Sequence, residues 1–372
     1  MAPVRYHLGA FPPANLDWLQ LVPLLGPASA ALARYDGVLS AIPNAEVLLS
    51  PLTTQEAVLS SRIEGTQATI TEVLEFEAKD EPGETDQRKV ADIYEVLNYR
   101  QAIRRAKDLL ADLPLSGRLI RAAHETLMQG VRGQNRAPGE FRKIQNWIGP
   151  PGCTEEEARF VPMVPGDLPD GMSAWEKYLN GKEPDALVQL AIVHAEFEAL
   201  HPFLDGNGRL GRMLIPLFLF ERKLLAAPTF YLSAFLEARR EEYYERLLAV
   251  SRDGDWTGWC TFFLRALTAQ AESNTRRAKD ILNLYEAKKD WVVEKTHSQH
   301  AVRALDFLFD RPIFASSDFV ARSGIPKPSA KRILKVLRDD GLLRVVREAA
   351  GRRTAILMFP ELLNIAEGKE AF

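Results

Sequence analysis

Hydrophobic positions recur at steps of three and four residues along most of this chain, which is the spacing of one face of an α-helix. The pattern is sharpest before residue 201, where the positions on the shared face are Leu187, Leu190, Ala191, His194, Phe197 and His201. It resumes from 209 to 225, where Pro216 predicts a kink or a local break. Further helical patterns cover residues 29–42, 53–65, 89–110, 116–129, parts of 230–271, and 275–294. The sequence therefore predicts a mainly α-helical protein.

The C-terminal region changes to shorter elements after residue 298. Its predicted elements are helices at 301–309, 316–323 and 328–339, then strands at 344–348 and 354–359. Three helices and a hairpin look like a winged helix. The third helix is basic and the hairpin holds Arg352 and Arg353, which suits contacts to DNA phosphates. Such modules also serve as protein docking or dimer surfaces, so DNA and protein partners both stay open.

The turn from Asp205 to Gly208 is suited to holding an anion. Pro202 makes it hard for the preceding helix to continue, which leaves His201 in the last turn of that helix. The two glycines and the asparagine tolerate positive φ, so successive N–H groups can point to one side at the start of the next helix. Helix N-termini favour anions, and Arg209 and Arg212 lie three residues apart on one face. The predicted ligand is a polyphosphate.

Two other interpretations compete for this turn. Residues 206–211 match G-x-G-x-x-G, the dinucleotide fingerprint, which should follow a strand and carry an acidic residue about twenty positions later at a strand end. Here a predicted helix precedes the motif and Glu221 lies inside the next helix, which disfavours that interpretation. A plain turn beside a helix-end histidine explains each feature alone, but not all of them within twelve residues. No P-loop motif occurs in the sequence.

The run from His201 to Arg212 resembles the full motif of the Fic-domain family, H-P-F-x-[DE]-G-N-G-R-x-x-R, with no departure. The resemblance implies an α-helical core that transfers AMP from ATP to a Ser, Thr or Tyr hydroxyl of a protein. It implies that His201 accepts the hydroxyl proton, that Asp205 holds Mg²⁺, that Arg212 reaches the far end of the triphosphate, and that Phe203 packs in the core. The implied nucleotide-binding residues are Gly206, Asn207, Gly208, Arg209, Leu210, Gly211, Arg212 and, beside the adenine, Tyr243.

The chemistry suits these residue types. A neutral imidazole is an effective base near pH 7. Attack on phosphorus needs a metal ion and cations placed to offset charge on the phosphate oxygens. Tyr243 could equally be an aromatic residue of a helical core.

An inhibitory segment is predicted N-terminal to this motif. Thr53 to Glu56 is a candidate capping box that opens a helix, and Gly65 is a natural end for it. Ser60 and Glu64 lie four residues apart and resemble the family's inhibitory motif, [ST]-x-x-x-E-[GN], although a solvent-facing polar surface is the simpler alternative. The resemblance implies that Glu64 pairs with Arg212 and occupies the cation meant for the γ-phosphate.

Residues 143–148 and 159–163 carry strand-like residues around Gly-Pro-Pro-Gly, which predicts a hairpin with a long loop. The hairpin follows Pro-Gly-Glu-Phe-Arg at 138–142 and resembles the family's flap, which would hold a target segment like an added strand. A surface hairpin without a role is the alternative. His124 is interpreted as a packed core histidine, and the acidic stretch at 80–87 as a loop.

Composition sets the remaining limits. The chain has 372 residues, 46% of them hydrophobic and 26% charged, which describes a folded protein with room for several domains. The net charge of −3 argues against general attraction to nucleic acids or membranes, although local patches stay possible. Two cysteines give neither a disulfide framework nor metal-ligand spacing. Without a signal sequence or a long apolar run, a cytoplasmic location is predicted.

The predicted organisation is mainly α, with an N-terminal arm at 1–50, a Fic-type core at 51–290 and a winged-helix domain at 291–372. The core includes the inhibitory helix at about 53–65 and the flap hairpin at about 140–165. The predicted activity is protein adenylyltransfer from ATP with Mg²⁺, onto an unidentified protein and onto the chain itself, restrained by Glu64. Removal of AMP, transfer of another nucleotide or phosphate group, and a nucleotide-sensing DNA-binding regulator are the alternatives. The sequence leaves a homodimer open and predicts no membrane partner.

Overall fold

The computed structural model describes residues 2–78, 86–130, 136–351 and 353–372 of the chain. Most of the loop predicted at 80–87, and Arg352, lie outside the described residues. The chain divides into two compact units, each assembled from separate segments. The first consists of Met1–Asp36, Leu59–Gly65 and Leu97–Glu272, and the second of Gly37–Val58, Thr66–Val96 and Ser273–Phe372.

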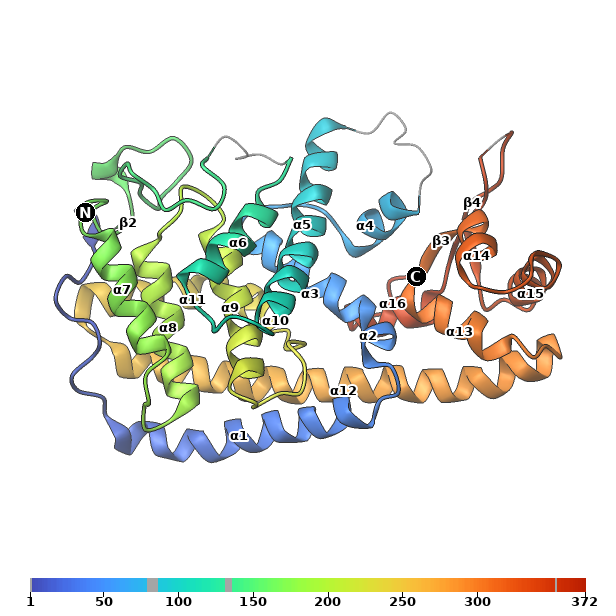
Figure 1. Ribbon diagram of the computed structural model, residues 1–372, viewed down its shortest axis with the longest axis horizontal. Coiled ribbons are helices and arrows are strands. Elements are labelled where there is room, and N and C mark those ends of the chain that lie inside the picture. The colour runs from blue at the N-terminus through green and yellow to red at the C-terminus, as the bar shows by residue number, and fades with distance from the viewer. Residues whose placement is uncertain (1, 79–85, 131–135, 352) are drawn as a thin grey trace. The chain divides into compact units, whose positions relative to one another are not determined.

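Helices dominate both units, which confirms the mainly α prediction (Figure 1). Wholly or partly in the first unit are β1 (Val4–Arg5), α1 (Trp18–Ala41), α3 (Ser50–Ile63), α5 (Gln87–Leu109), α6 (Gly117–Leu127), the 3₁₀ helix η1 (Glu155–Glu157), β2 (Phe160–Val161), α7 (Leu168–Leu179), α8 (Ala186–Leu200), α9 (Asn207–Glu221), α10 (Ser233–Ala238), α11 (Arg240–Asp253) and α12 (Trp256–Thr296). Wholly in the second are α2 (Ala45–Leu48), α4 (Ile70–Glu77), α13 (Ala301–Asp310), β3 (Ile313–Ala315), α14 (Ser316–Arg322), α15 (Lys327–Asp339), β4 (Arg344–Arg347), β5 (Ile356–Met358) and α16 (Pro360–Glu367). Among the described residues, no helix is both long and apolar enough to cross a lipid bilayer.

Helix α8 forms the centre of the first unit. The Asp185 carboxylate caps its start by accepting from the backbone N–H groups of Leu187 and Val188, at 2.8 and 3.0 Å. Thirteen of its fifteen residues are buried, so it is enclosed on all sides and not only along the predicted apolar face. It packs against α7, α9 and α11 (Figure 1). A helix held this tightly places the residue at its C-terminal end, His201, with little freedom.

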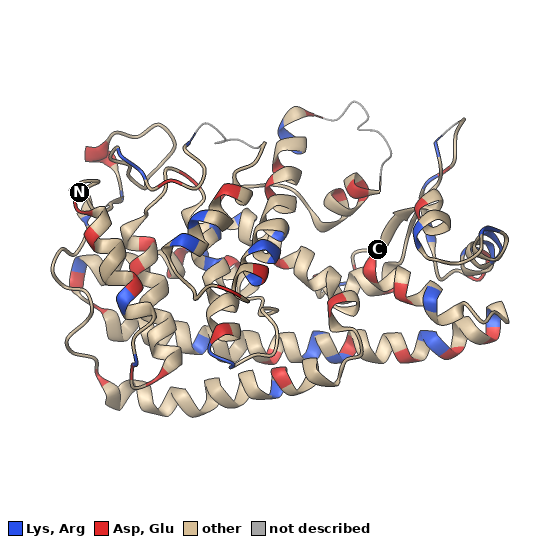
Figure 2. Cartoon of the chain, viewed as in Figure 1, with Lys and Arg blue, Asp and Glu red and all other residues tan. Residues whose placement is uncertain are grey.

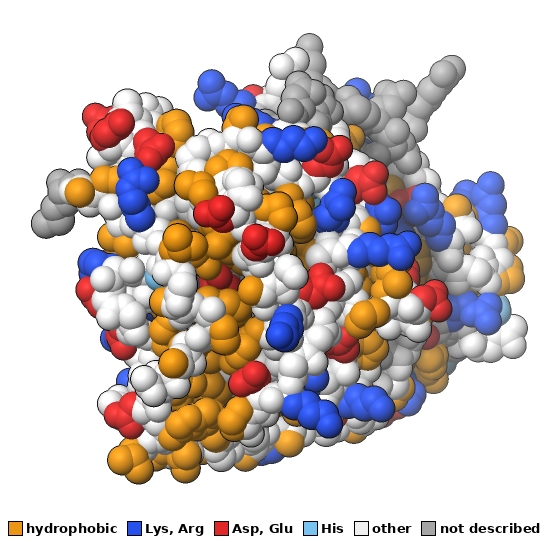
Figure 3. Space-filling view, turned by 60° about the vertical axis from the view of Figure 1, so that its left-hand side comes forward, with side chains coloured by type: hydrophobic (Ala, Val, Ile, Leu, Met, Phe, Trp, Pro, Cys, Tyr) orange, Lys and Arg blue, Asp and Glu red, His pale blue; other side chains and the backbone are white. Residues whose placement is uncertain are grey.

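Several predicted helix boundaries are wrong. Helix α1 begins at Trp18, well before residue 29, and includes both Pro23 and Pro27. A proline inside a helix leaves a carbonyl one turn earlier without its partner, and water can solvate that carbonyl here because Leu19 is 90% exposed. In Figure 3, hydrophobic side chains gather in the lower left part of the visible surface. The break predicted at Pro216 is absent, because α9 runs continuously from Asn207 to Glu221.

The capping box predicted at Thr53 is also wrong. Helix α3 begins three residues earlier, at Ser50, so the threonine lies inside the helix, where its hydroxyl donates to the Leu49 carbonyl at 3.4 Å. The structure instead has a capping box at Thr69 and Glu72, at the start of α4. The predicted end of α3 is correct, since the helix stops at Ile63, just before Gly65. The charged helix predicted at 275–294 is part of the much longer α12.

The predicted two-stranded hairpin is present only as one antiparallel bridge and not as a ladder. Only Ile148 bridges back to Phe160 in the antiparallel sense, while the residues between them form a turn and the helix η1. The loop contains Pro150 and Pro151, which have no N–H group to donate to a regular ladder. Strand β2 pairs instead with β1 in parallel, so the N-terminal segment supplies the partner that the hairpin does not.

In the second unit, the three helices and two strands predicted between 301 and 359 are confirmed. The structure adds β3, which pairs antiparallel with β5, so the sheet has the order β3-β5-β4. Phe307, Phe314 and Phe319 meet edge to face or tilted in the core between the sheet and the helices. Strand β3 was missed because its three residues were too few to show a period-two pattern.

Candidate active site

His201 directly follows α8 and ends it. Its backbone lies in the left-handed region at φ 48°, since Pro202 prevents the helix from continuing, and its N–H donates to the Phe197 carbonyl at 3.0 Å. Among the described residues, no group hydrogen-bonds to its buried Nδ1. Burial lowers the pKa of His201 to about 4, although the nearby Glu64 carboxylate opposes this shift. The imidazole is therefore neutral near pH 7.

The loop after His201 is held by side chains on both sides. The Asn207 amide accepts from the Phe203 N–H and donates to the Phe203 carbonyl, both at 2.8 Å. The Phe203 ring is buried and stacks on His124 with centroids 3.9 Å apart. His124 is fully buried and donates through Nε2 to the Asp205 carbonyl at 3.1 Å, which confirms its prediction as a packed core histidine. The burial of Phe203 is confirmed as well.

The turn from Asp205 to Gly208 leads directly into α9. Gly206 precedes the helix at φ +78°, and Asn207 and Gly208 already belong to the first helical turn, earlier than the predicted start at 209. The first turn of a helix carries N–H groups without partners inside the helix, so an anion is favoured here. The Asp205 carboxylate accepts from the Gly206 N–H at 2.6 Å and from the Arg209 guanidinium at 3.4 Å. Its side chain is 44% exposed and accessible to solvent cations.

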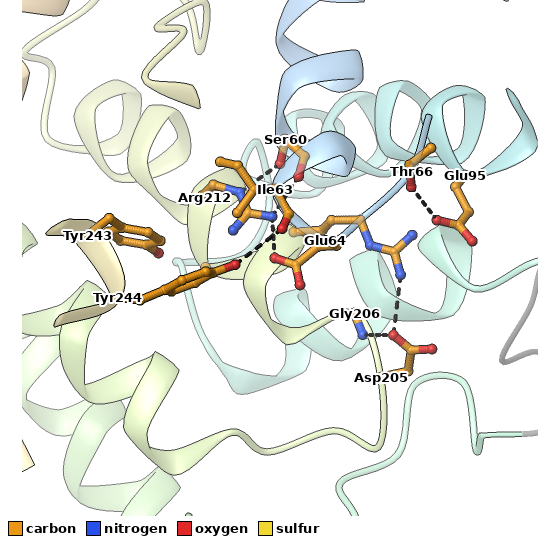
Figure 4. A network of polar contacts seen from close by, with 12 residues as sticks. Ser60, Ile63, Glu64, Thr66, Glu95, Asp205, Gly206, Arg212, Tyr243 and Tyr244 are labelled. Atoms are coloured by element: carbon orange, nitrogen blue, oxygen red, sulfur yellow. Dashed lines mark hydrogen bonds and ion pairs between the residues drawn. The ribbon is translucent and has the colours of Figure 1, made fainter. Parts of the chain in front are cut away.

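Arg212 points from α9 to the end of α3, and its side chain is only 1% exposed (Figure 4). Its Nε donates to the Ser60 hydroxyl at 3.0 Å, and its Nη2 donates to the Ser60 carbonyl at 2.8 Å and to Glu64 Oε1 at 2.7 Å. Burial alone would raise the pKa of Glu64, but the Arg212 charge and hydrogen bond outweigh it and lower the pKa. The predicted Glu64–Arg212 pair is therefore present as an ionised contact.

Two further contacts hold the Glu64 segment in place. The Tyr244 hydroxyl, from α11, donates to the Ile63 carbonyl at 3.2 Å (Figure 4). Gly208 leaves room for the carboxylate, because a Cβ atom at that position would lie 2.2 Å from Glu64 Oε1. The first turn of α9 and the end of α3 are thus fitted to each other.

These groups open into one cavity of about 420 Å³, a size typical of small-molecule sites. Its lining includes His201, Gly208, Arg212, Glu64, Glu198, Tyr243, Tyr244, Ile148, Gly149, Pro150, Arg159 and Phe160. Tyr243 is buried and its hydroxyl bonds to His194 Nε2 at 2.9 Å, so it is both a core aromatic and part of the cavity wall. Leu210 and Gly211 are buried in α9; the His194 Nδ1 atom bonds to the Gly211 carbonyl at 2.9 Å.

Sequence reasoning missed Glu198, three residues before the histidine. Its Oε1 atom is buried, and the described residues offer it no hydrogen-bond partner. Burial raises the pKa of Glu198 to about 8; Arg212 opposes this rise and Glu64 adds to it. A Cβ atom at Gly211 would lie 2.1 Å from Oε1, so the carboxyl group rests against α9. The spacing of Glu198 to His201 was a usable signal, but only the fold shows that both face one cavity.

The sequence assigned no role to Arg142 beyond its place at the end of the Pro-Gly-Glu-Phe-Arg run at 138–142. Its side chain is buried and donates to the backbone carbonyls of His201 at 2.9 Å, Leu200 at 3.3 Å and Met163. Its own N–H donates to the Pro202 carbonyl at 2.9 Å. Burial lowers the pKa of Arg142 to about 10, which leaves it charged at pH 7. Arg142 thus ties the loop after α8 to residues 143–163.

The described part of the chain holds no cluster of three or more His, Cys, Asp or Glu side chains that could enclose a metal ion by themselves. Mg²⁺ commonly binds through one or two carboxylates, with water and substrate phosphates completing its shell. Asp205, exposed beside the first turn of α9, fits that kind of site.

Comparison with known families agrees with this geometry. Residues 22–108 match the Fic/DOC family N-terminal model, and residues 114–219 match the Fic/DOC family model. The chain contains Fic/DOC family domains. The second Fic/DOC match includes α8, the loop after His201 and nearly all of α9, while the first includes α3 with Glu64.

Curated relatives of these Fic/DOC domains are similar over part of their length. The chain is 29% identical over 120 residues to the protein adenylyltransferase Fic of Drosophila grimshawi, covering 32% of this chain and 22% of that protein. It is 29% identical over 212 residues to a probable protein adenylyltransferase of Aquifex aeolicus, covering 56% of this chain and 60% of that protein. The matches thus span about a fifth and three fifths of these relatives.

Solved structures share the Fic/DOC fold. A Fic family protein from Desulfovibrio desulfuricans has a TM-score of 0.58 at 21% identity and covers 94% of this chain and 98% of its own. A Fic domain containing signaling protein from Bacteroides thetaiotaomicron has a TM-score of 0.54 at 17% identity, covering 69% and 97% of the two chains. At these identities the likeness concerns the fold alone.

Proposed function

We propose that this protein is an adenylyltransferase that moves AMP from ATP to a hydroxyl group of a protein. The observation that carries the proposal is one cavity lined by the half-buried, neutral His201, by the first turn of α9 and by the buried cation of Arg212. The names of the relatives support the same reaction type.

The cavity suits a nucleoside triphosphate. Its phosphates would meet the N–H groups of the first turn of α9, with Gly208 leaving space for close approach, and Arg209 and Arg212 would supply positive charge. Mg²⁺ held by Asp205 would neutralise charge on the α- and β-phosphates when bound. The apolar wall beside Tyr243 suits the adenine ring. Leu210 and Gly211 would hold the helix that carries the phosphate-binding residues.

His201 is the proposed base. His201 lines the cavity and its imidazole is neutral, so the ring can accept a proton from an incoming hydroxyl. The hydroxyl oxygen forms a bond to the α-phosphorus, the bond from that phosphorus to the bridging oxygen breaks, and pyrophosphate leaves. The proton stays on His201 until it is released to solvent. Ile148 and Pro150 line the cavity and are the proposed contacts for the target segment.

The contact between Glu64 and Arg212 is the proposed restraint. While Glu64 occupies the guanidinium at 2.7 Å, a γ-phosphate has no access to that cation. ATP then binds with its phosphates displaced, and a small displacement of the reacting phosphorus slows transfer steeply. The Ser60 contacts hold Arg212 in the orientation that Glu64 requires. The domain boundaries at 50 and 290, self-modification, a homodimer and a cytoplasmic location remain predictions.

The decisive experiment compares label at two positions of ATP. With purified full-length protein and cell lysate as a source of targets, α-³²P label should appear on protein and γ-³²P label should not. Labelling should increase at least tenfold in Glu64→Gly and vanish in the double variant that adds His201→Ala. Equal α-label from UTP would favour uridylyl transfer, γ-label would favour phosphate transfer, and loss of AMP from a pre-labelled protein would favour the reverse reaction. An unlabelled Glu64→Gly protein overturns the proposal.

A further inference from the structure

Helices α14 and α15 of the second unit form a helix-turn-helix. Helix α14 ends at Arg322 and α15 begins at Lys327, so the turn between them is four residues long. Gly324 takes a positive φ of +66° within this turn, which reverses the chain direction. A short glycine-containing turn of this kind is typical of motifs in which the second helix enters the DNA major groove.

Helix α15 has two distinct faces. Its apolar face, with Ala330, Ile333, Leu334 and Leu337, is buried in the unit. A neighbouring face carries exposed basic side chains at steps of four, four and three residues, namely Lys327, Lys331, Lys335 and Arg338. Figure 2 shows these blue positions gathered on α15. Because the buried face fixes the helix, the basic face points to solvent as one row about three turns long.

A groove of about 800 Å³ lies beside this row. The basic side chains of α15 form one wall, Ser316 and Ser317 of α14 contribute to a second, and Thr354 lies next to β5 on a third. Arg344 and Arg353, at the ends of the β4–β5 hairpin, are also exposed. Hydroxyl and cationic groups around one groove are the side chains that usually bind DNA phosphates.

The positive charge is local. Residues 298–372 contain thirteen Lys and Arg against nine Asp and Glu, whereas the whole chain has a net charge of −3. The acidic residues closest to the row are already paired: Asp339 lies 3.4 Å from Arg338, Asp340 lies 3.8 Å from Lys295, and Asp318 lies 3.6 Å from Arg322. They leave the middle of the row, Lys331 and Lys335, positive.

We infer that this face binds duplex DNA, with α15 in the major groove and the β4–β5 hairpin against the adjacent phosphates. The major groove of B-DNA is about 12 Å wide and admits one α-helix, and the exposed end of α15 near Lys327 would reach the base edges. This binding is separate from the proposed transferase reaction, since none of its residues lines the cavity of His201.

The test measures binding of the full-length protein to a mixed-sequence 20-base-pair duplex by fluorescence anisotropy. Four phosphate contacts predict a slope of about −3.6 for the logarithm of affinity against that of salt, or about 150-fold weaker binding at 200 mM than at 50 mM salt. The double variant Lys331→Ala, Lys335→Ala should bind at least tenfold more weakly at 50 mM salt, with its slope reduced to about −1.8. Alanine keeps the helix intact, because it has the highest helix propensity.

The matched control is Lys177→Ala with Lys182→Ala, which removes the same charge from exposed positions of the first unit. It should bind DNA like the wild type, and both double variants should retain α-³²P labelling. A wild-type protein that does not bind the duplex at 100 µM and 50 mM salt overturns the inference, and so does an equal loss in both double variants. A self-association seen by sedimentation and abolished only by the α15 variant, without DNA binding, would show that this face docks a protein instead.

Discussion

Replacing Glu64 by Gln should lower the free energy of unfolding of the nucleotide-free protein and tighten its binding of ATP. The substitution keeps the shape of the side chain but removes the charge that Arg212 contacts at 2.7 Å. Removing one partner of a fully buried pair costs about 3–5 kcal/mol. Here the Arg212 side chain is 1% exposed, but the Glu64 side chain is 36% exposed, so water screens the pair. We therefore expect a loss of about 1–2 kcal/mol.

This loss can be read by thermal unfolding. For 372 residues the unfolding entropy is about 0.8 kcal/mol per degree, so Tm should fall by about 1–3 °C without nucleotide. In the variant, Arg212 can pair with the γ-phosphate, and a charge-assisted bond of about 1.5 kcal/mol corresponds to about tenfold tighter ATP binding. At an ATP concentration of 100 times the Kd of the variant, the nucleotide should stabilise the variant by about 2.7 kcal/mol and the wild type by about 1.4 kcal/mol. ATP should thus largely remove the difference in Tm between the Glu64→Gln variant and the wild type.

The measurements are scanning fluorimetry with and without ATP, and titration calorimetry for the Kd. Glu125→Gln is the matched control, because Glu125 pairs with Arg105 at 3.1 Å while its side chain is 54% exposed. It should change the free energy of unfolding by less than about 0.5 kcal/mol and leave ATP binding unchanged. A Glu64→Gln protein with the stability and the ATP affinity of the wild type would show that Glu64 does not restrain Arg212.

Three further predictions concern the same cavity. In Glu64→Gly, kcat/KM should stay flat from pH 8 down to about pH 5, because the pKa of His201 is lowered to about 4; a tenfold fall between pH 6.5 and 5.5 would contradict His201 as a base with that lowered pKa. Arg212→Ala should lose label transfer, and adding Glu64→Gly should not restore it; full restoration would mean that Arg212 serves only to receive the glutamate. Glu198→Gln should stabilise the fold at alkaline pH: the pKa of Glu198 is raised to about 8 from 4.5, so its contribution is full below pH 4.5 and is lost as pH rises through 8. Chemical denaturation should show the advantage of the variant growing to on the order of 5 kcal/mol across that range, and a pH-independent difference would refute the assignment.

Local sequence signals predicted the helix-loop-helix of the site well. Pro202 ends α8, glycine tolerates the left-handed turn at Gly206, and the apolar spacing marks the helices on both sides. The contact of Glu64 with Arg212, 148 residues apart, followed only from a motif resemblance and not from spacing. The structure contains that contact, while its effect on activity stays a proposal.

The misses share a physical cause, which is that tertiary partners override local preference. The strand at 160–161 pairs with the N-terminal segment, so its own hairpin does not form a ladder. Thr53 has the residue type of a helix cap but lies inside a helix that begins at Ser50. The spacing of Glu198 to His201 indicates a shared region, but only the packing of the fold shows that the Glu198 Oε1 atom is buried and that Arg142 contacts the His201 carbonyl.

The hydrogen bonds of Arg142 hold His201 and the ends of the segment 143–163 in place, but not the middle of that segment. One guanidinium fixes the backbone of His201 and of Met163, so the histidine and both ends of the segment from 143 to 163 form a single anchored frame. The middle of that segment, residues 149–158, belongs to no regular sheet. Under the proposed function, exchanging the sequence of this loop should change which polypeptide is modified while His201 stays in position, so the loop is where target choice could be engineered.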